Sequence, residues 1–308
     1  MKKKCSLILL LALLFFEYTE AQTEKLYTQK EVIYGRKDGM ALTMFVNTPK
    51  KTNGKALLYI ASGGYFSSAD WIGDIADRMS TEYFKRGYTV FVVMHGSAPF
   101  YTGEEVLSDI RKAVQFVRYN AKEYHIDPDK IGMTGTSAGG NLSCVMGATD
   151  VKSTDPNAKP EEKVSSKVQA VACFCPPTDF LNYGTLNNSV VSNEKMLLEN
   201  GLKPSFTFTE YVKATNSMEV ITDETKIREV LTHMSPAQLA DKTTAPTFIF
   251  HGDADPLVPF QQATLYMDKL KSLGVPAKLS VKKGAAHGWP GMEVDAKELA
   301  DWFDIYLK

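Results

Sequence analysis

Short apolar runs alternate with longer amphipathic segments along most of this chain. Residues 56–60 and 89–94 are almost continuously apolar, and similar runs follow at 130–134, 168–174 and 247–250. Runs of this length and composition are typical of strands buried on both faces, which occur in parallel sheets covered by helices. The pattern therefore predicts an α/β domain with a mostly parallel central sheet and helices on both faces.

The segments between these runs supply the expected helices and two further kinds of strand. Strands at 30–36 and 41–47 flank an Asp38-Gly39 pair, which favours a hairpin turn, and a last strand is expected at 278–281. Apolar residues at helical spacing, closed in places by glycine, predict the helices between the strands. The predicted helices cover residues 68–86, 102–124, 138–147, 259–273 and 294–307.

Residues 181–232 interrupt this alternation of predicted strands and helices. The segment holds no strong strand pattern but has helical stretches near 193–199 and 223–231. We expect it to form a small helical cap inserted over the edge of the sheet. Residues 22–308 would then be one α/β domain, a length that a single domain of this class can reach.

The first residues look like an export signal. Three lysines at positions 2–4 precede an apolar run at 6–16, and small residues stand three and one positions before a cleavage point after Ala21. This is the pattern of a signal peptide over residues 1–21, and the apolar run is shorter than the roughly 20 residues that a spanning helix needs. We expect a secreted or periplasmic protein without a stable membrane span after cleavage, with an uncleaved anchor as the alternative.

Charge and cysteine content exclude several classes of function. The formal net charge is −1, so nothing predicts binding to nucleic acid. After the signal peptide the chain keeps Cys144, Cys173 and Cys175, an odd number without zinc-site spacing. Buried free thiols are the expected reading, with a metal site or redox pair as the alternative, and we expect neither a metal nor another cofactor.

Gly135-Thr136-Ser137-Ala138-Gly139 matches the Gly-x-Ser-x-Gly pattern of a nucleophile elbow. Three fixed small residues can also occur by chance in an ordinary loop. Here, however, a predicted strand precedes Ser137 and a helix of small residues follows it, which is the setting that an elbow requires. The context therefore predicts that Ser137 is a nucleophile.

A serine nucleophile needs a histidine base and a carboxylate that orients it, in the chain order Ser, acid, His. His287 lies in a loop of small residues after the last strand, whereas His251 ends a strand and is expected to pack structurally. Asp253 and Asp255 both follow the strand before the last one. Their positions leave the two aspartates as alternatives for the acid.

An oxyanion hole needs backbone N–H groups beside the nucleophile. Ala138 directly follows Ser137, and the loop after the first buried strand contains Gly63 and Gly64. These three residues are the predicted donors, against the alternative of a plain Gly-Gly turn. Tyr65 and Trp289 adjoin the site in sequence and are candidates for the pocket wall, with ordinary packing as an equal alternative.

Several motifs together give the chain a family resemblance. They are GTSAGG around Ser137, HGDADPLVP, GAAHGW around His287, IDPDKIG and PPTDF. With them, residues 30–308 outside the cap resemble the α/β-hydrolases, particularly the esterase/lipase group that includes feruloyl- and acetylxylan-esterase-like (BD-FAE-like) proteins. The resemblance implies that Asp255 is the acid. One departure is Ala61-Ser62, which replaces the His-Gly found in many relatives at the oxyanion loop.

The resemblance implies a secreted serine hydrolase that cleaves carboxylic esters through an acyl-enzyme. Its substrate would be a small-molecule or oligosaccharide ester, with acylated carbohydrate as the candidate. One alternative is a peptidase of the prolyl-oligopeptidase type, although such enzymes usually carry a large N-terminal propeller that this sequence does not provide. Another is a non-catalytic binding protein, although such relatives typically lack one of the three catalytic residues.

Overall fold

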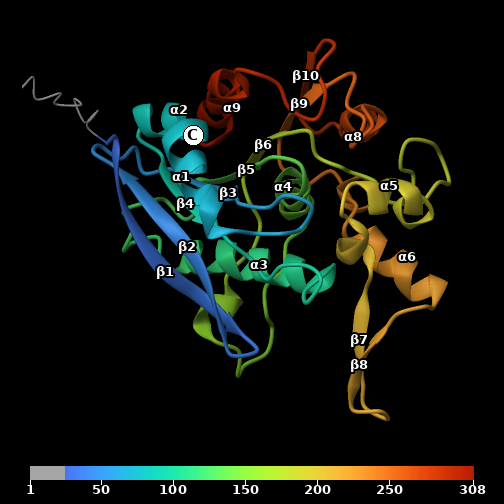
Figure 1. The fold of residues 1–308 in the computed structure, drawn as a ribbon. Helices are drawn as coiled ribbons and strands as arrows, with labels where there is room; N and C mark the ends of the chain where they lie inside the picture. The colour runs from blue at the N-terminus through green and yellow to red at the C-terminus, as the bar shows by residue number, and fades with distance from the viewer. Residues whose placement is uncertain (1–24) are drawn as a thin grey trace, which may run out of the picture.

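A single sheet of eight strands organises the computed structural model, which describes residues 25–308 (Figure 1). The predicted signal peptide lies outside the described residues. The strand order is β1-β2-β4-β3-β5-β6-β9-β10. The strands are β1 (Tyr27–Lys37), β2 (Met40–Pro49), β3 (Ala56–Ile60), β4 (Thr89–Val93), β5 (Ile131–Gly135), β6 (Ala170–Phe174), β9 (Thr247–Gly252) and β10 (Ala277–Lys282).

Six of these strands, from β4 to β10 in spatial order, are parallel to one another. β1 pairs with β2, and β2 with β4, in antiparallel register. Asp38 and Gly39 join β1 to β2 and both have positive φ, as a two-residue hairpin turn requires. The predicted mostly parallel sheet is therefore confirmed.

Helices cover both faces of the sheet and create two apolar cores. Successive strand residues point to opposite faces of the sheet. In β3, Leu58 and Ile60 belong to the core under α3, α4 and α8. Leu57 and Tyr59 belong to the core under α1, α2 and α9 on the other face. The bounds are α1 (Ile72–Asp74), α2 (Thr81–Lys85), α3 (Glu104–Tyr119), α4 (Ala138–Ala148), α8 (Gln261–Ser272) and α9 (Met292–Tyr306).

The predicted helices agree with the observed ones, apart from one helix that is divided and one that ends earlier than expected. The helix expected over 68–86 is divided into α1, a π-helical turn (Ile75–Met79) and α2. The helix expected over 102–124 is α3, which ends at Tyr119 and is followed by turns up to His125, whose φ is positive. None of the helices within residues 25–308 is long and apolar enough to cross a lipid bilayer.

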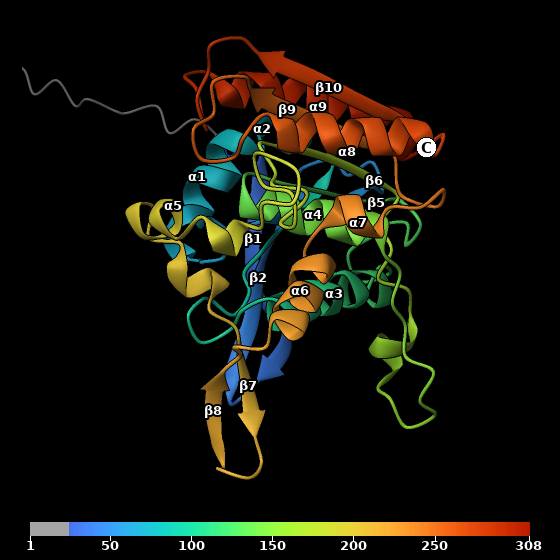
Figure 2. The same ribbon diagram turned by 90° about the vertical axis from the view of Figure 1, so that its right-hand side faces the viewer.

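The cap segment, residues 181–232, is not purely helical. It contains the expected helices α5 (Glu194–Glu199) and α6 (Glu224–His233), but also an antiparallel hairpin of β7 (Thr209–Val212) and β8 (Ser217–Val220). The hairpin extends away from the body of the domain (Figures 1 and 2). The expectation of a small helical cap was therefore incomplete. The sequence shows no strong strand pattern here because β8 is exposed throughout and therefore needs no buried apolar face.

The topology collects the predicted site residues at one edge of the sheet. β5 ends at Gly135, two residues before Ser137, and the loops after β9 and β10 carry Asp255 and His287. Because these strands are parallel, their carboxyl ends meet at the same edge, which is where open α/β sheets build their sites. A short helix, α7 (Pro236–Leu239), connects the cap segment to β9.

Candidate active site

Ser137 stands on a sharp turn between β5 and α4. Its φ of 57° and ψ of −120° lie outside the regions that non-glycine residues favour. The turn needs glycine on both sides for lack of space: a Cβ on Gly135 would lie 2.6 Å from the carbonyl carbon of Gly139, and one on Gly139 would lie 2.4 Å from the Ile60 oxygen. The strand, the strained serine and the helix together have the geometry of a nucleophile elbow.

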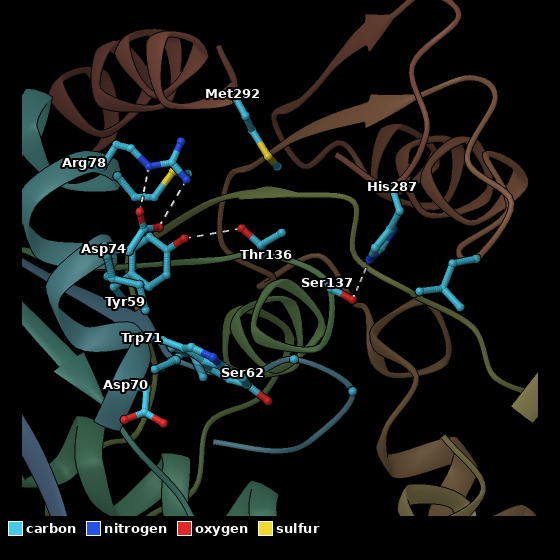
Figure 3. A pocket seen from close by; sticks show the side chains of 17 residues that line it. Tyr59, Ser62, Asp70, Trp71, Asp74, Arg78, Thr136, Ser137, His287 and Met292 are labelled. Carbon is cyan, nitrogen blue, oxygen red and sulfur yellow. Dashed lines mark hydrogen bonds and ion pairs between the residues drawn. The ribbon is translucent and has the colours of Figure 1, made fainter. Parts of the chain in front are cut away.

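Three side chains from different loops form a continuous hydrogen-bonded line. His287 Nε2 lies 2.8 Å from Ser137 Oγ (Figure 3). On the other side of the ring, His287 Nδ1 lies 2.7 Å from Asp255 Oδ2. An ionised carboxylate only accepts hydrogen bonds, so Nδ1 carries the proton and Nε2 is left to accept the serine hydroxyl. The structure thus brings together the three residues expected to act in catalysis.

Asp255, and not Asp253, faces the histidine. The Asp255 side chain is fully buried, whereas Asp253 is exposed and accepts the Gly284 N–H at 2.5 Å, which ties together two loops. Two backbone N–H groups, those of Leu257 and Val258, donate to Asp255 Oδ1 at 2.9 Å. Sequence position left the two aspartates as alternatives, and the direction of their side chains separates them.

The environment of Asp255 keeps this buried carboxylate ionised. Burial raises the pKa of Asp255, but hydrogen bonds from His251 and His287, the charge of His287 and the Val258 N–H lower it by more. The resulting pKa lies well below the usual range for an aspartate. A charged Asp255 is therefore available to stabilise an imidazolium at its side.

His251 is a contact of Asp255 that the sequence did not reveal. It is fully buried, and its Nε2 lies 2.9 Å from the Val258 carbonyl oxygen and 3.4 Å from Asp255 Oδ2. Both neighbours accept, so Nε2 carries the proton, while Nδ1 has no partner among the described residues. The expectation that His251 only packs was incomplete, although its place in the HGDADPLVP motif offered a signal.

The predicted oxyanion donors do not all remain available. The Gly63 N–H donates to the Phe66 carbonyl at 2.9 Å, and the Phe66 N–H donates back to Gly63. The prediction of Gly63 as a free donor is therefore wrong in this structure, because a local pair of bonds already uses its N–H. Within residues 25–308, the N–H groups of Gly64 and Ala138 have no acceptor, and both residues line the same small chamber beside Ser137.

Other groups support the oxyanion loop where many relatives have a histidine and this chain has Ala61. The Ser67 hydroxyl donates to the Ala61 carbonyl at 2.6 Å, and the Ala61 N–H donates to Val93 of β4 at 3.0 Å. From the cap segment, the Ser205 hydroxyl donates to the Gly64 carbonyl at 2.5 Å. Ser205 is a residue of the site that the sequence gave no reason to choose.

Two cavities of very different size meet at Ser137 and Gly64. The larger one has a volume of about 600 Å³ and is lined by His287, Trp71 and a charged pair in which Arg78 holds Asp74 through two nitrogens (Figure 3). The smaller one has a volume of about 40 Å³ and is walled by apolar and aromatic residues, several of them from the cap segment. We refer to them as the large cavity and the small chamber.

The two aromatic candidates for the pocket wall lie in different surroundings. Tyr65 lines the small chamber and its hydroxyl donates to Asn141 Oδ1 at 2.9 Å. Trp289 packs against Phe174 and Phe250, with ring centroids 6.0 and 6.1 Å away. Among the described residues, the lining of the large cavity and of the small chamber does not include Trp289, so packing is the role that its contacts support.

The cysteines are buried free thiols, as expected. Cys144 and Cys173 lie with their Sγ atoms 3.7 Å apart, while Cys175 lies beside His251 and Asp255, with donor atoms within 4.8 Å of one another. Burial raises the pKa of the Cys175 thiol to about 12, so it stays protonated at neutral pH. A protonated thiol and a nitrogen that already carries a proton are poor metal ligands.

Comparison with known proteins finds several hydrolases that are similar to this chain. It is 26% identical over 218 residues to a probable carboxylic ester hydrolase, LipM, of Mycobacterium tuberculosis, covering 70% of this chain and 45% of that protein. It is also 27% identical over 150 residues to an acetylxylan esterase of Xylanibacter ruminicola, covering 44% of this chain and 28% of that protein. The chain thus spans less than half the length of these two curated relatives.

Solved structures share the fold over nearly the whole chain. A truncated carbohydrate esterase from gut microbiota superposes with a TM-score of 0.71 at 24% identity, covering 92% of this chain and 98% of that one. A propionate-bound esterase of Thermogutta terrifontis gives a TM-score of 0.66 at 22% identity, covering 90% and 93%. The model of the BD-FAE family matches residues 42–270, which is more than half of the sequence. The chain therefore has the α/β-hydrolase fold and belongs to the BD-FAE family.

Proposed function

We propose that the protein hydrolyses carboxylic esters with Ser137 as nucleophile, His287 as general base and acid, and Asp255 as the group that orients His287. The observation that carries the proposal is the hydrogen-bonded line from Ser137 Oγ through His287 to Asp255, with distances of 2.8 and 2.7 Å. A serine hydroxyl is a weak nucleophile unless a base within hydrogen-bond reach takes its proton, and His287 Nε2 is placed to do so.

In the first half of the reaction, Ser137 Oγ attacks the ester carbonyl while its proton passes to His287 Nε2. The carbonyl oxygen becomes an oxyanion, which the Gly64 and Ala138 N–H groups stabilise because they have no other acceptor within the described chain. The imidazolium next to the ionised Asp255 then gives its proton to the leaving alcohol. The alcohol departs and an acyl-enzyme ester on Ser137 remains.

In the second half, a water molecule gives a proton to His287 Nε2 and attacks the acyl carbon. The tetrahedral intermediate collapses, Ser137 Oγ recovers the proton from His287, and the carboxylic acid is released. Asp255 stays ionised throughout, because its pKa lies well below its ordinary value. Burial of Asp255 and its four N–H contacts hold the carboxylate in one orientation during both halves.

For the substrate, we propose an acylated carbohydrate. The large cavity combines an indole ring, Trp71, with the Arg78–Asp74 pair, which offers both donors and acceptors for hydroxyl groups. A volume of about 600 Å³ can hold a sugar ring. The names of two similar proteins, an acetylxylan esterase and a gut carbohydrate esterase, agree with this choice. The apolar run and cleavage pattern of residues 1–21 support export to the substrate.

The experiment is hydrolysis of p-nitrophenyl acetate by the purified protein, compared with Ser137→Ala and with Ser272→Ala as a matched control. Ser272 is exposed on α8, so the same chemical change there leaves the site intact. Ester hydrolysis should disappear in Ser137→Ala and persist in Ser272→Ala. Hydrolysis that survives Ser137→Ala would refute the mechanism, whereas faster cleavage of a prolyl-amide peptide than of the ester would favour a peptidase.

A further inference from the structure

We propose that the two cavities divide the ester between them: the alcohol part occupies the large cavity and the acyl part occupies the small chamber, whose size limits the acyl group to a short chain of about four carbons or fewer. The inference rests on the proposed function, because it takes Ser137 as the nucleophile and His287 as the group that protonates the leaving alcohol. It adds which group enters which cavity and which residues set the acyl length.

The direction of the substrate follows from the position of His287. In the tetrahedral intermediate, the carbon attached to Ser137 Oγ carries an oxyanion, the leaving oxygen and the acyl substituent. The leaving oxygen must face His287 Nε2, and His287 lines the large cavity. The oxyanion must face the N–H groups of Gly64 and Ala138.

The acyl substituent is then left with the small chamber. This chamber opens on Ser137 and is also lined by Gly64 and Ala138, whereas His287 is not part of its lining among the described residues. An acyl chain placed there would leave the path between the leaving oxygen and His287 free. The reverse placement would put the alcohol oxygen on the side that lacks the proton donor.

The volumes of the two spaces fit these roles. The small chamber holds about 40 Å³, compared with about 600 Å³ in the large cavity. A cavity needs about 10–15 Å³ on this measure to hold one water molecule, so the chamber has room for about three groups of that size, such as the alkyl carbons of a butyryl group. An aromatic acyl group such as feruloyl is too large for it, and no charged side chain of the described residues lines it to attract an anionic acyl group.

The chamber walls are held in place by contacts among aromatic rings. Phe206 packs edge-on against Phe180 and Tyr65, with ring centroids 5.3 and 5.9 Å away. Hydrogen bonds fix two of the rings in the wall: the Tyr65 hydroxyl donates to Asn141, and the Tyr183 hydroxyl donates to the Leu257 carbonyl at 2.6 Å. Because tightly packed side chains resist displacement, an added methylene has to move rings that are already constrained.

The cap segment supplies the part of the chamber that limits its length. Met196 and Leu202 line the chamber from the region of α5, and Phe206 lines it from the turn that also carries Ser205. A Cβ on Gly64 would lie only 2.6 Å from Leu202 Cδ2, which shows how closely the cap segment approaches the oxyanion loop. We therefore assign acyl selectivity to the cap segment.

The test is a series of p-nitrophenyl esters with one alcohol and acyl groups of two, three, four and six carbons, with rates divided by those of alkaline hydrolysis. The kcat/KM of the wild-type protein should fall about tenfold or more for each methylene beyond the size that the chamber accepts. Acetate, propionate and butyrate should therefore be cleaved with similar kcat/KM, and hexanoate, which is two methylenes longer than butyrate, should be cleaved at least about a hundredfold more slowly.

Two matched variants test the assignment of the cavities. Met196 and Met292 are both half-buried, but Met196 lines the small chamber and Met292 lines the large cavity. Met196→Ala should raise the ratio of hexanoate to acetate kcat/KM about tenfold, while Met292→Ala should leave this ratio within about twofold of the wild-type value. Phe206→Leu is a second widening variant and should change the ratio in the same direction.

The outcomes separate this inference from the proposed function. Two results would overturn the assignment while leaving an active esterase. One is similar kcat/KM values from acetate to hexanoate. The other is a hexanoate-to-acetate ratio that responds to Met292→Ala but not to Met196→Ala or Phe206→Leu. If the wild-type protein hydrolysed no ester faster than the Ser137→Ala variant does, both the proposed function and this inference would be overturned.

Discussion

The Ser205 hydroxyl in the cap segment donates to the carbonyl of Gly64 at 2.5 Å. Gly64 has a φ of 56° and, like Ala138, is a predicted oxyanion donor whose N–H has no acceptor among residues 25–308. The contact therefore links the segment that walls the small chamber to the backbone that would stabilise the transition state. It also supplies support for a loop in which Ala61 stands where many relatives have a histidine.

Ser205→Ala should lower kcat more than it changes KM for p-nitrophenyl acetate. A typical hydrogen bond contributes about 1 kcal/mol, so the expected loss is roughly fivefold. Ser192→Ala is the matched control, because Ser192 also lies in the cap segment but is exposed. Steady-state kinetics of the three proteins would check this, and equal kcat values for Ser205→Ala and Ser192→Ala would contradict the supporting role.

Asp255→Asn and Asp253→Asn should differ by orders of magnitude in activity. An asparagine at 255 presents an amide to His287, which favours the wrong tautomer of the imidazole, and losses of about 10⁴ in kcat accompany this change in a serine protease triad. Asp253 only accepts the Gly284 N–H in an exposed turn, so its variant should keep activity within about threefold. A larger loss from Asp253→Asn than from Asp255→Asn would refute the assignment of the acid.

The pH dependence of stability should carry the signature of Asp255. Its pKa is lowered in the folded protein, although burial alone raises it, because of the bonds from His251 and His287. In the unfolded chain an aspartate titrates near about 3.9. The ionised carboxylate therefore contributes stability above this pH, and the contribution is lost as pH falls toward the lower folded pKa.

Urea unfolding of wild type and Asp255→Asn between pH 7 and pH 3 would measure this contribution. The difference in the free energy of unfolding between the two proteins should be constant above about pH 5 and change only below about pH 4. Asp253→Asn serves as the control, since its carboxylate is exposed. A difference that changes between pH 7 and pH 5 would show that another group is responsible.

Replacing Ser62 or Ser67 of the oxyanion loop by alanine should change the free energy of unfolding in opposite directions. Ser62 Oγ is buried, lies on the wall of the large cavity and has no hydrogen-bond partner within the described residues (Figure 3). Removing an unpaired buried hydroxyl should raise the free energy of unfolding by about 1 kcal/mol. Ser67 Oγ donates to the Ala61 carbonyl at 2.6 Å, so Ser67→Ala should lower it by about 1 kcal/mol.

Urea denaturation of Ser62→Ala, Ser67→Ala and wild type would show the two effects side by side. The pair is informative because both serines lie in one loop and lose the same atom. If Ser62→Ala were destabilising by as much as Ser67→Ala, the Ser62 hydroxyl would have a partner that the structure does not show.

Much of the fold could be predicted because its signals are local. The apolar run at 56–60 coincides with β3, and the runs at 89–94 and 130–134 lie within one residue of β4 and β5 at either end. A strand buried on both faces must be apolar throughout, so its sequence is recognisable without knowledge of its neighbours. The hairpin of β7 and β8 escaped prediction for the opposite reason: β8 is exposed and β7 is only partly buried, so neither strand needs a continuous apolar run.

The chain order of Ser137, an aspartate after β9 and His287 was also readable, because backbone turns and loops of small residues leave a pattern in the sequence. The sequence by itself therefore determined the sheet, its helices and the loops that carry the site.

The tertiary structure alone decided which aspartate faces His287, why Gly63 cannot donate while Gly64 can, and how the cap segment narrows one side of Ser137 to a small chamber. These outcomes depend on the directions of single side chains and N–H groups between segments far apart in the chain, such as Ser205 and Gly64. Such directions are set only when the whole domain packs.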